Sequence, residues 1–281
     1  MRILRFIVYS NVWVGMAVMA FAWLTLHELG RESFPYLLFT FFFTVATYNY
    51  MRLVQIRSYS GEHGLNQKFW LKQHVIQAVF FTVVFSFLGA WFYLELFSWR
   101  LVALTALPAV ISFFYPLSFR HPFRSFTSLR AVPGLKVLLI AGSWAYITQL
   151  VPVIYWQGPE TGDWVEFGLR SLFIVALIIP FDIRDMHMDD RNMRTIPQIF
   201  GVKRSKQLAL FMIFIYAGWK ALEIANGHIE LYEGLAWILG LFYAGFLIFR
   251  MHPARSELYC GFWVEGTPIL IAVIVFLLRL I

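Results

Sequence analysis

This chain lacks the sequence signatures of several common enzyme classes. It has one cysteine, Cys260, in 281 residues, which excludes an intrachain disulfide framework. It contains no Gly-rich phosphate loop, no Cys/His pattern with metal-ligand spacing and no Ser-centred nucleophile elbow. These absences argue against a P-loop nucleotide enzyme, a zinc-thiolate protein and an α/β-hydrolase.

Charged residues are also scarce. They make up 14% of the chain, against 60% hydrophobic residues, and the mean hydropathy is strongly positive. A soluble domain of this size does not need such a composition, whereas a polytopic membrane protein does. Because there is no composition shift, long polar linker, low-complexity tract or defensible internal repeat, we expect a single all-α transmembrane domain over residues 1–281.

Nine apolar stretches are long enough to be membrane spans. They are predicted at residues 6–27, 34–54, 73–94, 100–119, 133–154, 167–185, 206–225, 232–250 and 265–281. An odd number places the two termini on opposite sides of the membrane. The triplet Ala20-Phe21-Ala22 resembles a signal-peptidase site, but the apolar stretch continues to Leu26, so we expect the segment to be retained.

The basic residues give the predicted bundle an orientation. The N-terminus and the loops that follow the second, fourth, sixth and eighth spans hold 18 of the 23 Lys and Arg residues. The opposite side holds 5 of these and 9 of the 16 acidic residues. By the positive-inside rule the basic side is cytoplasmic. The net charge of +7 therefore favours anionic headgroups and does not indicate nucleic-acid binding. With no organellar transit peptide evident, a prokaryotic plasma membrane is the expected location.

Three carboxylates at the end of the sixth span are the main chemical signal. On a helix, Asp182, Asp185 and Asp189 fall within roughly 60° of one another, while Arg184 points to the other side. Charge at membrane depth is costly and usually marks a site. Three carboxylates on one stripe need a cation, and Mg²⁺ that holds a substrate phosphate is a suitable one. The plainer alternative is an interfacial helix end whose acids pair with nearby basic residues.

The same segment resembles the second aspartate motif of the UbiA-type intramembrane prenyltransferases. The three aspartates are followed by Arg194-Thr195-Ile196-Pro197 and by Gly201, close to the family pattern. Weaker matches lie elsewhere, at Tyr115-Pro116, Pro133-Gly134-Leu135-Lys136 and Glu265-Gly266. The resemblance implies a nine-helix bundle with a lateral lipid-facing cavity. It also implies a prenyl diphosphate substrate and a lipid-soluble acceptor.

The first aspartate motif of that family is lost. Where the family has Asn-Asp-x-x-Asp-x-x-x-Asp at the end of its second span, this chain keeps Asn49 but has Tyr50, Leu53 and Arg57 in place of the three aspartates. Without those carboxylates, the second of the family's ion sites is missing. We therefore expect one Mg²⁺, held by Asp182, Asp185 and Asp189, which the resemblance makes the catalytic residues.

Basic side chains are the predicted replacement for the second ion, because they can contact phosphate oxygens directly. The predicted substrate-binding residues are Asn49, Arg52, Arg57, Arg120, Lys136 and Lys203. Substitute metal ligands at Glu62 and His63 are an alternative.

Three functions remain open at the level of sequence. The first is prenyl transfer to a membrane-borne acceptor at a degenerate site. The second is a catalytically lapsed relative that binds an isoprenoid, a quinone-like lipid or a membrane partner, which the replaced first motif favours. The third is a transporter, for which we see little support because charged residues lie close to the span ends and not in their middles.

Overall fold

The computed structural model of this protein describes residues 2–56, 66–117, 134–188 and 193–280. In these parts of the chain every regular element is helical. In chain order they are α1 (Arg2–Tyr9), α2 (Val12–Glu28), α3 (Phe34–Ile56), α4 (Asn66–Gln73), α5 (Val75–Glu95), α6 (Trp99–Phe114), α7 (Leu135–Ala145), η2 (Tyr146–Leu150), α8 (Val151–Trp156), α9 (Thr161–Asp185), α10 (Ile196–Ala225), α11 (Leu231–Phe249), η4 (Tyr259–Val264) and α12 (Thr267–Arg279). The expectation of an all-α membrane protein is confirmed.

The predicted number of nine spans needs a small correction. Seven helical segments of the described chain are long and apolar enough to cross a membrane, and an eighth is the pair α1 and α2, bent by 65°. The remaining predicted span, the fourth at 100–119, corresponds to α6, which has only 16 residues. At about 1.5 Å per residue, α6 is about 24 Å long, shorter than the ~30 Å hydrocarbon core.

The bend in the first predicted span lies at Asn11. This residue has a left-handed backbone conformation, with φ 64° and ψ 11°, which an asparagine adopts more readily than most side chains. Its side-chain amide donates a hydrogen bond to Oδ1 of Asn49 on α3, at 3.0 Å. The break is therefore fixed by a buried contact between helices, which the hydropathy pattern does not reveal.

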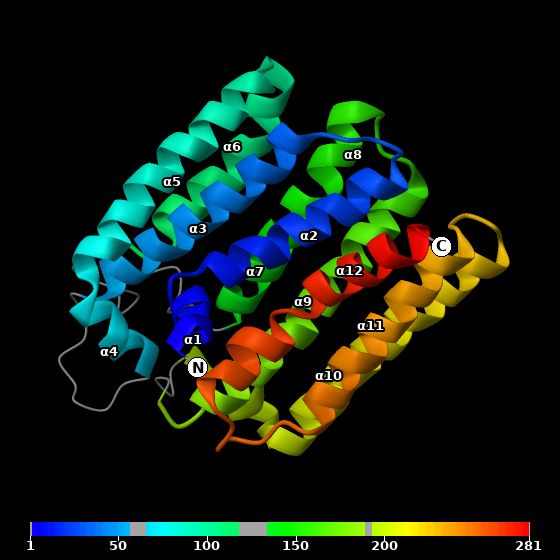
Figure 1. Cartoon of the computed structure of the whole chain (residues 1–281). Coiled ribbons are helices and arrows are strands. Elements are labelled where there is room, and N and C mark those ends of the chain that lie inside the picture. Colours follow the sequence, from blue (N-terminus) through cyan, green and yellow to red (C-terminus); the bar gives the residue numbers. More distant parts are fainter. Residues whose placement is uncertain (1, 57–65, 118–133, 189–192, 281) are drawn as a thin grey trace, which may run out of the picture.

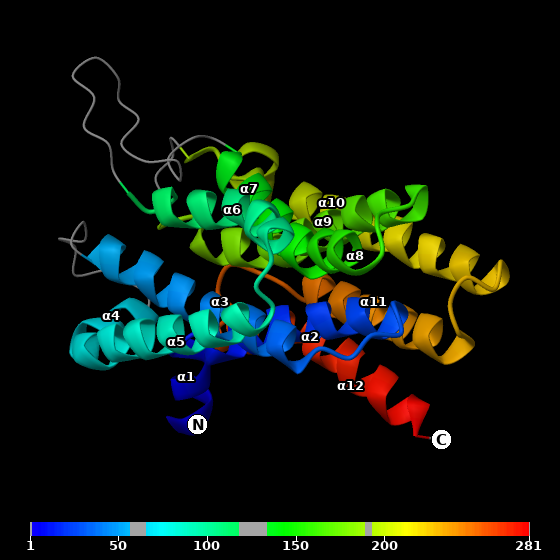
Figure 2. The same cartoon turned by 90° about the horizontal axis from the view of Figure 1, so that it is seen from above.

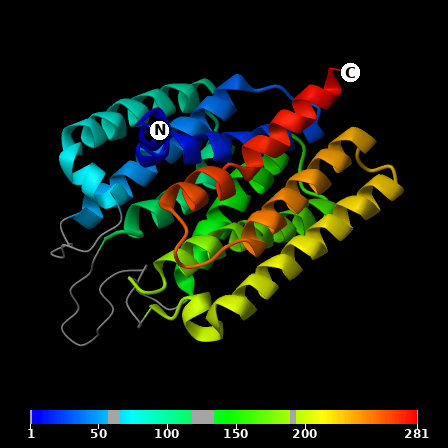
Figure 3. The same cartoon turned by 60° about the horizontal axis from the view of Figure 1, so that its bottom comes forward.

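The long helices run side by side in one bundle (Figures 1 and 3). Helix α2 packs against α3 and α12, and contacts then pass from α12 to α11, α10, α9 and α7. Seen from above, α6, α7, α9 and α10 lie on one side, and α2, α3, α5 and α11 lie on the other (Figure 2). Helix α6 contacts α3 and α8, so α3, α6, α7 and α9 surround the region where the cavity described below lies.

The main apolar core surrounds α9. Phe173, Ile179 and Ile183 of this helix are fully buried against residues such as Trp237 of α11 and Tyr216 of α10. By contrast, α5 has only Ala78 and Gly89 buried and presents most of its side chains outward, as a lipid-facing helix does. The best-packed part of the bundle is thus the helix that ends in the aspartate motif.

A buried network of charges lies near the other end of α9. Lys220 is 1% exposed and lies 3.1 Å from Glu166, 2.9 Å from Glu223 and 3.8 Å from Glu28. Arg170 is fully buried and donates to Glu166 and to the hydroxyl of Thr25. Glu166 precedes Asp182 by 16 positions, which corresponds to about 24 Å along the helix. This network is therefore far from the aspartate motif.

Candidate functional site

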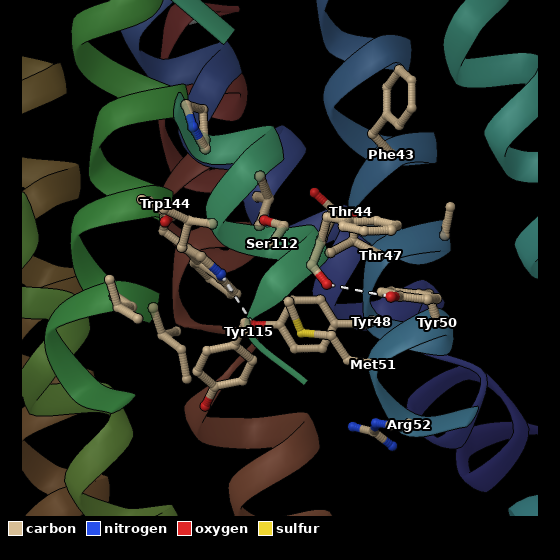
Figure 4. A pocket seen from close by; sticks show the side chains of 18 of the residues that line it. Phe43, Thr44, Thr47, Tyr48, Tyr50, Met51, Arg52, Ser112, Tyr115 and Trp144 are labelled. Atoms are coloured by element: carbon tan, nitrogen blue, oxygen red, sulfur yellow. Dashed lines mark hydrogen bonds between the residues drawn. The ribbon is translucent and has the colours of Figure 1, made fainter. Parts of the chain in front are cut away.

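A cavity of about 900 Å³ lies among α3, α6, α7 and α9. Its walls are mainly apolar and aromatic, and charged side chains from the ends of α3, α7 and α9 gather at one end. Figure 4 shows Phe43 at one end of the drawn part and Arg52 at the other, with Thr47, Tyr48 and Tyr115 between them. A volume of this size is typical of a site for a small ligand, which is about 300–1,000 Å³.

The charged end of the cavity carries more basic than acidic side chains. Arg52 comes from the last turns of α3, Lys136 from the first turn of α7 and Arg184 from the last turn of α9, and all three line the cavity. Exposed Lys72, near the end of α4, also contributes to the lining. These helix ends all lie on the side that carries most of the chain's basic residues, so an anionic group in the cavity would be held there.

Each described aspartate of the motif is paired with one of these cations. The carboxylate of Asp182 is fully buried, and its Oδ1 lies 2.7 Å from Nζ of Lys136. Arg184 binds Asp185 through two hydrogen bonds, Nε to Oδ1 at 2.8 Å and Nη2 to Oδ2 at 3.0 Å. The prediction that Arg184 points away from the three carboxylates does not hold for its side chain, which is long enough to reach the next carboxylate.

Two aromatic contacts fix the middle of the cavity wall. The indole of Trp144 donates to the hydroxyl of Tyr48 at 3.1 Å, which joins α7 to α3. The hydroxyl of Tyr50 donates to the carbonyl of Phe113 at 3.3 Å, and the two rings are stacked, which joins α3 to α6. Figure 4 shows Tyr48, Tyr50 and Trp144 around the hollow. The walls are thus held by contacts between helices rather than within one helix.

Solved structures supply the comparison, since no family model matches this sequence and no curated protein does. A UbiA homologue from Archaeoglobus fulgidus bound to GPP and Mg²⁺ aligns with a TM-score of 0.63 at 15% identity, over 100% of this chain and 99% of that chain. Its complex with DMAPP and Mg²⁺ aligns with a TM-score of 0.60 at 16% identity, over 100% and 98%. A structure of digeranylgeranylglyceryl phosphate synthase aligns at 0.54 and 12% identity, over 96% and 95%.

This chain has the UbiA fold. The resemblance seen in the sequence is therefore confirmed at the level of the fold, over essentially the full length of the chain.

Within the UbiA fold of this chain, the described residues do not form a Mg²⁺ site as they stand. No group of three His, Cys, Asp or Glu side chains in the described ranges is placed to hold a metal ion. The carboxylates of Asp182 and Asp185 have suitable chemistry for a hard divalent cation, but each is already held by a protein cation. A Mg²⁺ ion would have to exchange partners with Lys136 and Arg184.

The predicted site residues separate into three groups. Arg52, Lys136 and Asp185 line the cavity, and Asp182 lies directly behind Lys136. Asp189, Arg57 and Arg120 lie outside the described residues, as do Glu62 and His63.

Asn49 and Lys203 are not among the residues that line the cavity. The amide nitrogen of Asn49 donates to the carbonyls of Ser10 and Val45 and its oxygen accepts from Asn11, so the side chain acts in helix packing. Lys203 is exposed on α10, because this helix leads away from the cavity after the motif loop.

The segment after the motif is organised by its own hydrogen bonds. The backbone N–H of Thr195 donates to Oε1 of Gln198 at 3.0 Å where α10 starts, and Pro197 lies in the first turn of that helix. The side-chain amide of Gln198 also donates to the carbonyl of Met186, at 3.5 Å, and so ties the start of α10 to the end of α9.

Several cavity residues had a weak signal or none in the sequence. Arg184 lies inside the motif but was assigned to the wrong side, and Gln55 lies one turn beyond Arg52. In the sequence, Glu265 appears only in the weak match Glu265-Gly266. In the structure it directly follows η4 and lines the same cavity. A basic residue within an acidic motif is the signal that could have identified Arg184.

Proposed function

We propose that this chain binds a prenyl diphosphate in the cavity and transfers its prenyl group to an acceptor dissolved in the membrane. The observation that carries the proposal is the polarity of the cavity, with long apolar and aromatic walls and a cluster of basic side chains at one end. A prenyl diphosphate has the same division, an apolar tail and a strongly anionic head. The GPP and DMAPP complexes of the structural neighbours support this choice.

The basic end provides the chemistry of the leaving group. When the C1–O bond of a prenyl diphosphate breaks, the electron pair stays on the diphosphate, whose charge must be stabilised. Arg52, Lys136 and Arg184 can donate charge-assisted hydrogen bonds to phosphate oxygens. Lys136 and Arg184 already neutralise Asp182 and Asp185, so the incoming head group competes with these two carboxylates for them.

The aromatic walls serve the other product of the bond cleavage. An allylic cation is attracted by the faces of aromatic rings and survives only where water is excluded. Tyr48, Tyr115 and Trp144 line the cavity between its basic and apolar ends. The acceptor then supplies an electron pair for the new bond to C1 and loses a proton, which leaves a prenylated acceptor and free diphosphate.

One Mg²⁺ at Asp182, Asp185 and Asp189 stays a prediction from the sequence. When bound, such an ion would add positive charge beside the diphosphate. The described geometry provides that charge through side chains, so no step above depends on the ion.

The orientation is also part of the proposal. We infer that the N-terminus and the motif loop face the cytoplasm of a prokaryotic cell, because the basic helix ends lie on that side. In whole cells, a membrane-impermeant maleimide should label Asn226→Cys, between α10 and α11. It should label His252→Cys, after α11, only once the cells are permeabilised. The opposite labelling pattern would reverse the orientation.

Binding without turnover is a second candidate. Both described motif carboxylates are paired with cations. The cavity end of α3 presents Tyr50, which stands where the family has an aspartate, and Arg52 close to it. Such a site can hold an isoprenoid phosphate or a quinone-like lipid with no bond cleavage. The two candidates differ in one measurable quantity, the release of pyrophosphate.

The experiment measures pyrophosphate released by the purified chain in lipid nanodiscs. C10 to C40 prenyl diphosphates are supplied with a lipid-extractable acceptor pool, with and without Mg²⁺. The proposal predicts saturable release that Arg52→Gln reduces by at least about tenfold, since a hydrogen bond to a charged group contributes about 1.5–3 kcal/mol. Arg100→Gln is the matched control, because Arg100 is exposed at the start of α6 and does not line the cavity.

The possible outcomes separate the candidates. Release that fails in Asp182→Ala and needs Mg²⁺ supports transfer with the predicted ion. Release that does not depend on Mg²⁺ supports transfer driven by the basic side chains. Saturable binding with no release at any chain length would favour the second candidate, and neither binding nor release would leave only the fold.

A further inference from the structure

A second hollow lies on the outer face of the bundle, between α10 and α11. It has a volume of about 390 Å³ and is lined by apolar residues. Leu210, Phe214 and Ala217 of α10 face Phe242, Gly245 and Phe246 of α11 across it. The rings of Phe214, Phe242 and Phe246 are 73%, 70% and 57% exposed, so the groove opens to the surroundings of the protein.

Gly245 lines the groove without a side chain of its own. A Cβ atom built at this position would lie 3.6 Å from Leu210 and 4.0 Å from Ile213, which is ordinary contact distance. A larger side chain at this position would project between the two helices and fill the hollow. The small side chain of Ala217, on α10, also lines the groove.

Basic side chains lie at one end of this groove. Nζ of Lys206, one turn before Leu210, donates to the carbonyl of Met251 at 3.1 Å and lies 5.4 Å from the ring centre of Phe249. The guanidinium of Arg250, at the end of α11, lies 5.8 Å from the ring centre of Phe246. Phe249 and Phe246 both line the groove. The two cations are therefore placed over its end.

These cations have no acidic partner in the described part of the chain. The salt bridges there involve other basic residues, at the cavity and in the buried network. Lys203 is exposed one turn before Lys206 on the same face of α10 and adds a third positive charge. The end of the groove is thus positively charged and open to an anion.

The distance from Lys206 to the far end of the groove matches one leaflet of a bilayer. From Lys206 to Ala217 there are 11 positions, or about 16 Å along the helix, and half of the hydrocarbon core is about 15 Å. The apolar part would lie at acyl-chain depth when Lys206 and Arg250 lie at headgroup depth. On the proposed orientation this is the cytoplasmic leaflet, where anionic lipids accumulate.

We propose that the groove between α10 and α11 binds an anionic phospholipid, with one acyl chain along Phe214 and Phe246 and its phosphate at Lys206 and Arg250. The charge at the groove end selects for a headgroup of net negative charge over a zwitterionic one. This site is separate from the cavity and does not depend on the proposed prenyl transfer. In this proposal, Lys203 lies beside the lipid headgroup.

The test compares two lipids that share their acyl chains. The purified full chain is equilibrated with dioleoyl phosphatidylglycerol or dioleoyl phosphatidylcholine, and retained lipid is counted by native mass spectrometry. The proposal predicts retention of phosphatidylglycerol with a preference of roughly thirtyfold, the factor expected for two basic side chains near an anionic surface. The double variant Lys206→Gln/Arg250→Gln should remove this preference, whereas Arg100→Gln should keep it.

A second variant tests the apolar half of the site. Gly245→Leu fills the groove and should abolish retention of the anionic lipid, whereas Gly218→Leu should not, because Gly218 is exposed on α10 and does not line the groove. Equal retention of both lipids by the wild type would overturn the proposal. So would wild-type retention in the double variant, or a dimer that forms through the groove whichever lipid is present.

Discussion

At the scale of single residues, each described aspartate of the motif forms an ion pair with a basic side chain. The carboxylate of Asp182 has no solvent exposure and lies 2.7 Å from Nζ of Lys136. A buried carboxylate without a cation is very unfavourable, so the pair stabilises the junction of α7 and α9 even though ion pairs add little at a surface. The sequence placed both residues at one site. It could not show that they contact each other, because they lie 46 positions apart.

Lys136→Met should destabilise the protein by about 3 kcal/mol or more, because it removes the closest cation from a buried carboxylate. Unfolding in mixed micelles, followed by circular dichroism, measures the change. In the double variant Lys136→Met/Asp182→Asn the loss should be smaller than the sum of the single losses, by about 0.5–3 kcal/mol. Additive losses would show that the two side chains do not interact.

At the scale of elements, the helices were largely predictable and their breaks were not. The structure has a helix at every span that hydropathy predicts, because a long apolar run has few other stable forms in a membrane. The bend at Asn11 depends on its contact with Asn49, and the kink in α10 depends on the backbone of Gly201, where φ is 75° and ψ is 164°. Such features follow from tertiary contacts and local backbone geometry, which a hydropathy pattern does not encode.

Gly201→Ala should destabilise the protein by about 1–3 kcal/mol, since an L side chain in this conformation is strained even though no atom lies within 4 Å of the added Cβ. The matched control is Gly218→Ala in the same helix, where the Cβ also meets nothing within 4 Å and no positive φ is involved. The control should be neutral or more stable by about 0.5–1 kcal/mol. Thermal unfolding of both variants decides, and equal effects would contradict the strained conformation at Gly201.

At the scale of the whole molecule, the two ends of the bundle have different roles. At one end, Arg52, Lys136 and Arg184 line the cavity. The other end contains the buried network around Lys220, whose ion pairs join α2, α9 and α10. The sequence showed these charges only as residues near span ends. Their burial was not predictable, because it arises where α2 packs against α9 and α10, which lie far from it in the sequence.

Lys220→Met should destabilise the bundle by about 3–5 kcal/mol, because it leaves the carboxylate of Glu166 buried with less compensation. The exposed Arg100 provides the comparison, and Arg100→Met should change the free energy of unfolding by less than about 0.5 kcal/mol. Unfolding in mixed micelles distinguishes the two. A change in Lys220→Met as small as in the control would mean that the network does not stabilise this end.

The central claim is that the cavity holds a prenyl diphosphate, and the most direct test is calorimetric binding of geranyl diphosphate to the chain in nanodiscs. The account predicts saturable binding that Arg52→Gln weakens by about tenfold or more. It also predicts that Thr47→Trp abolishes binding, because Thr47 lines the cavity and an indole there would occupy the space of the prenyl chain. Absence of saturable binding in the wild type, or binding that neither substitution changes, would contradict the account.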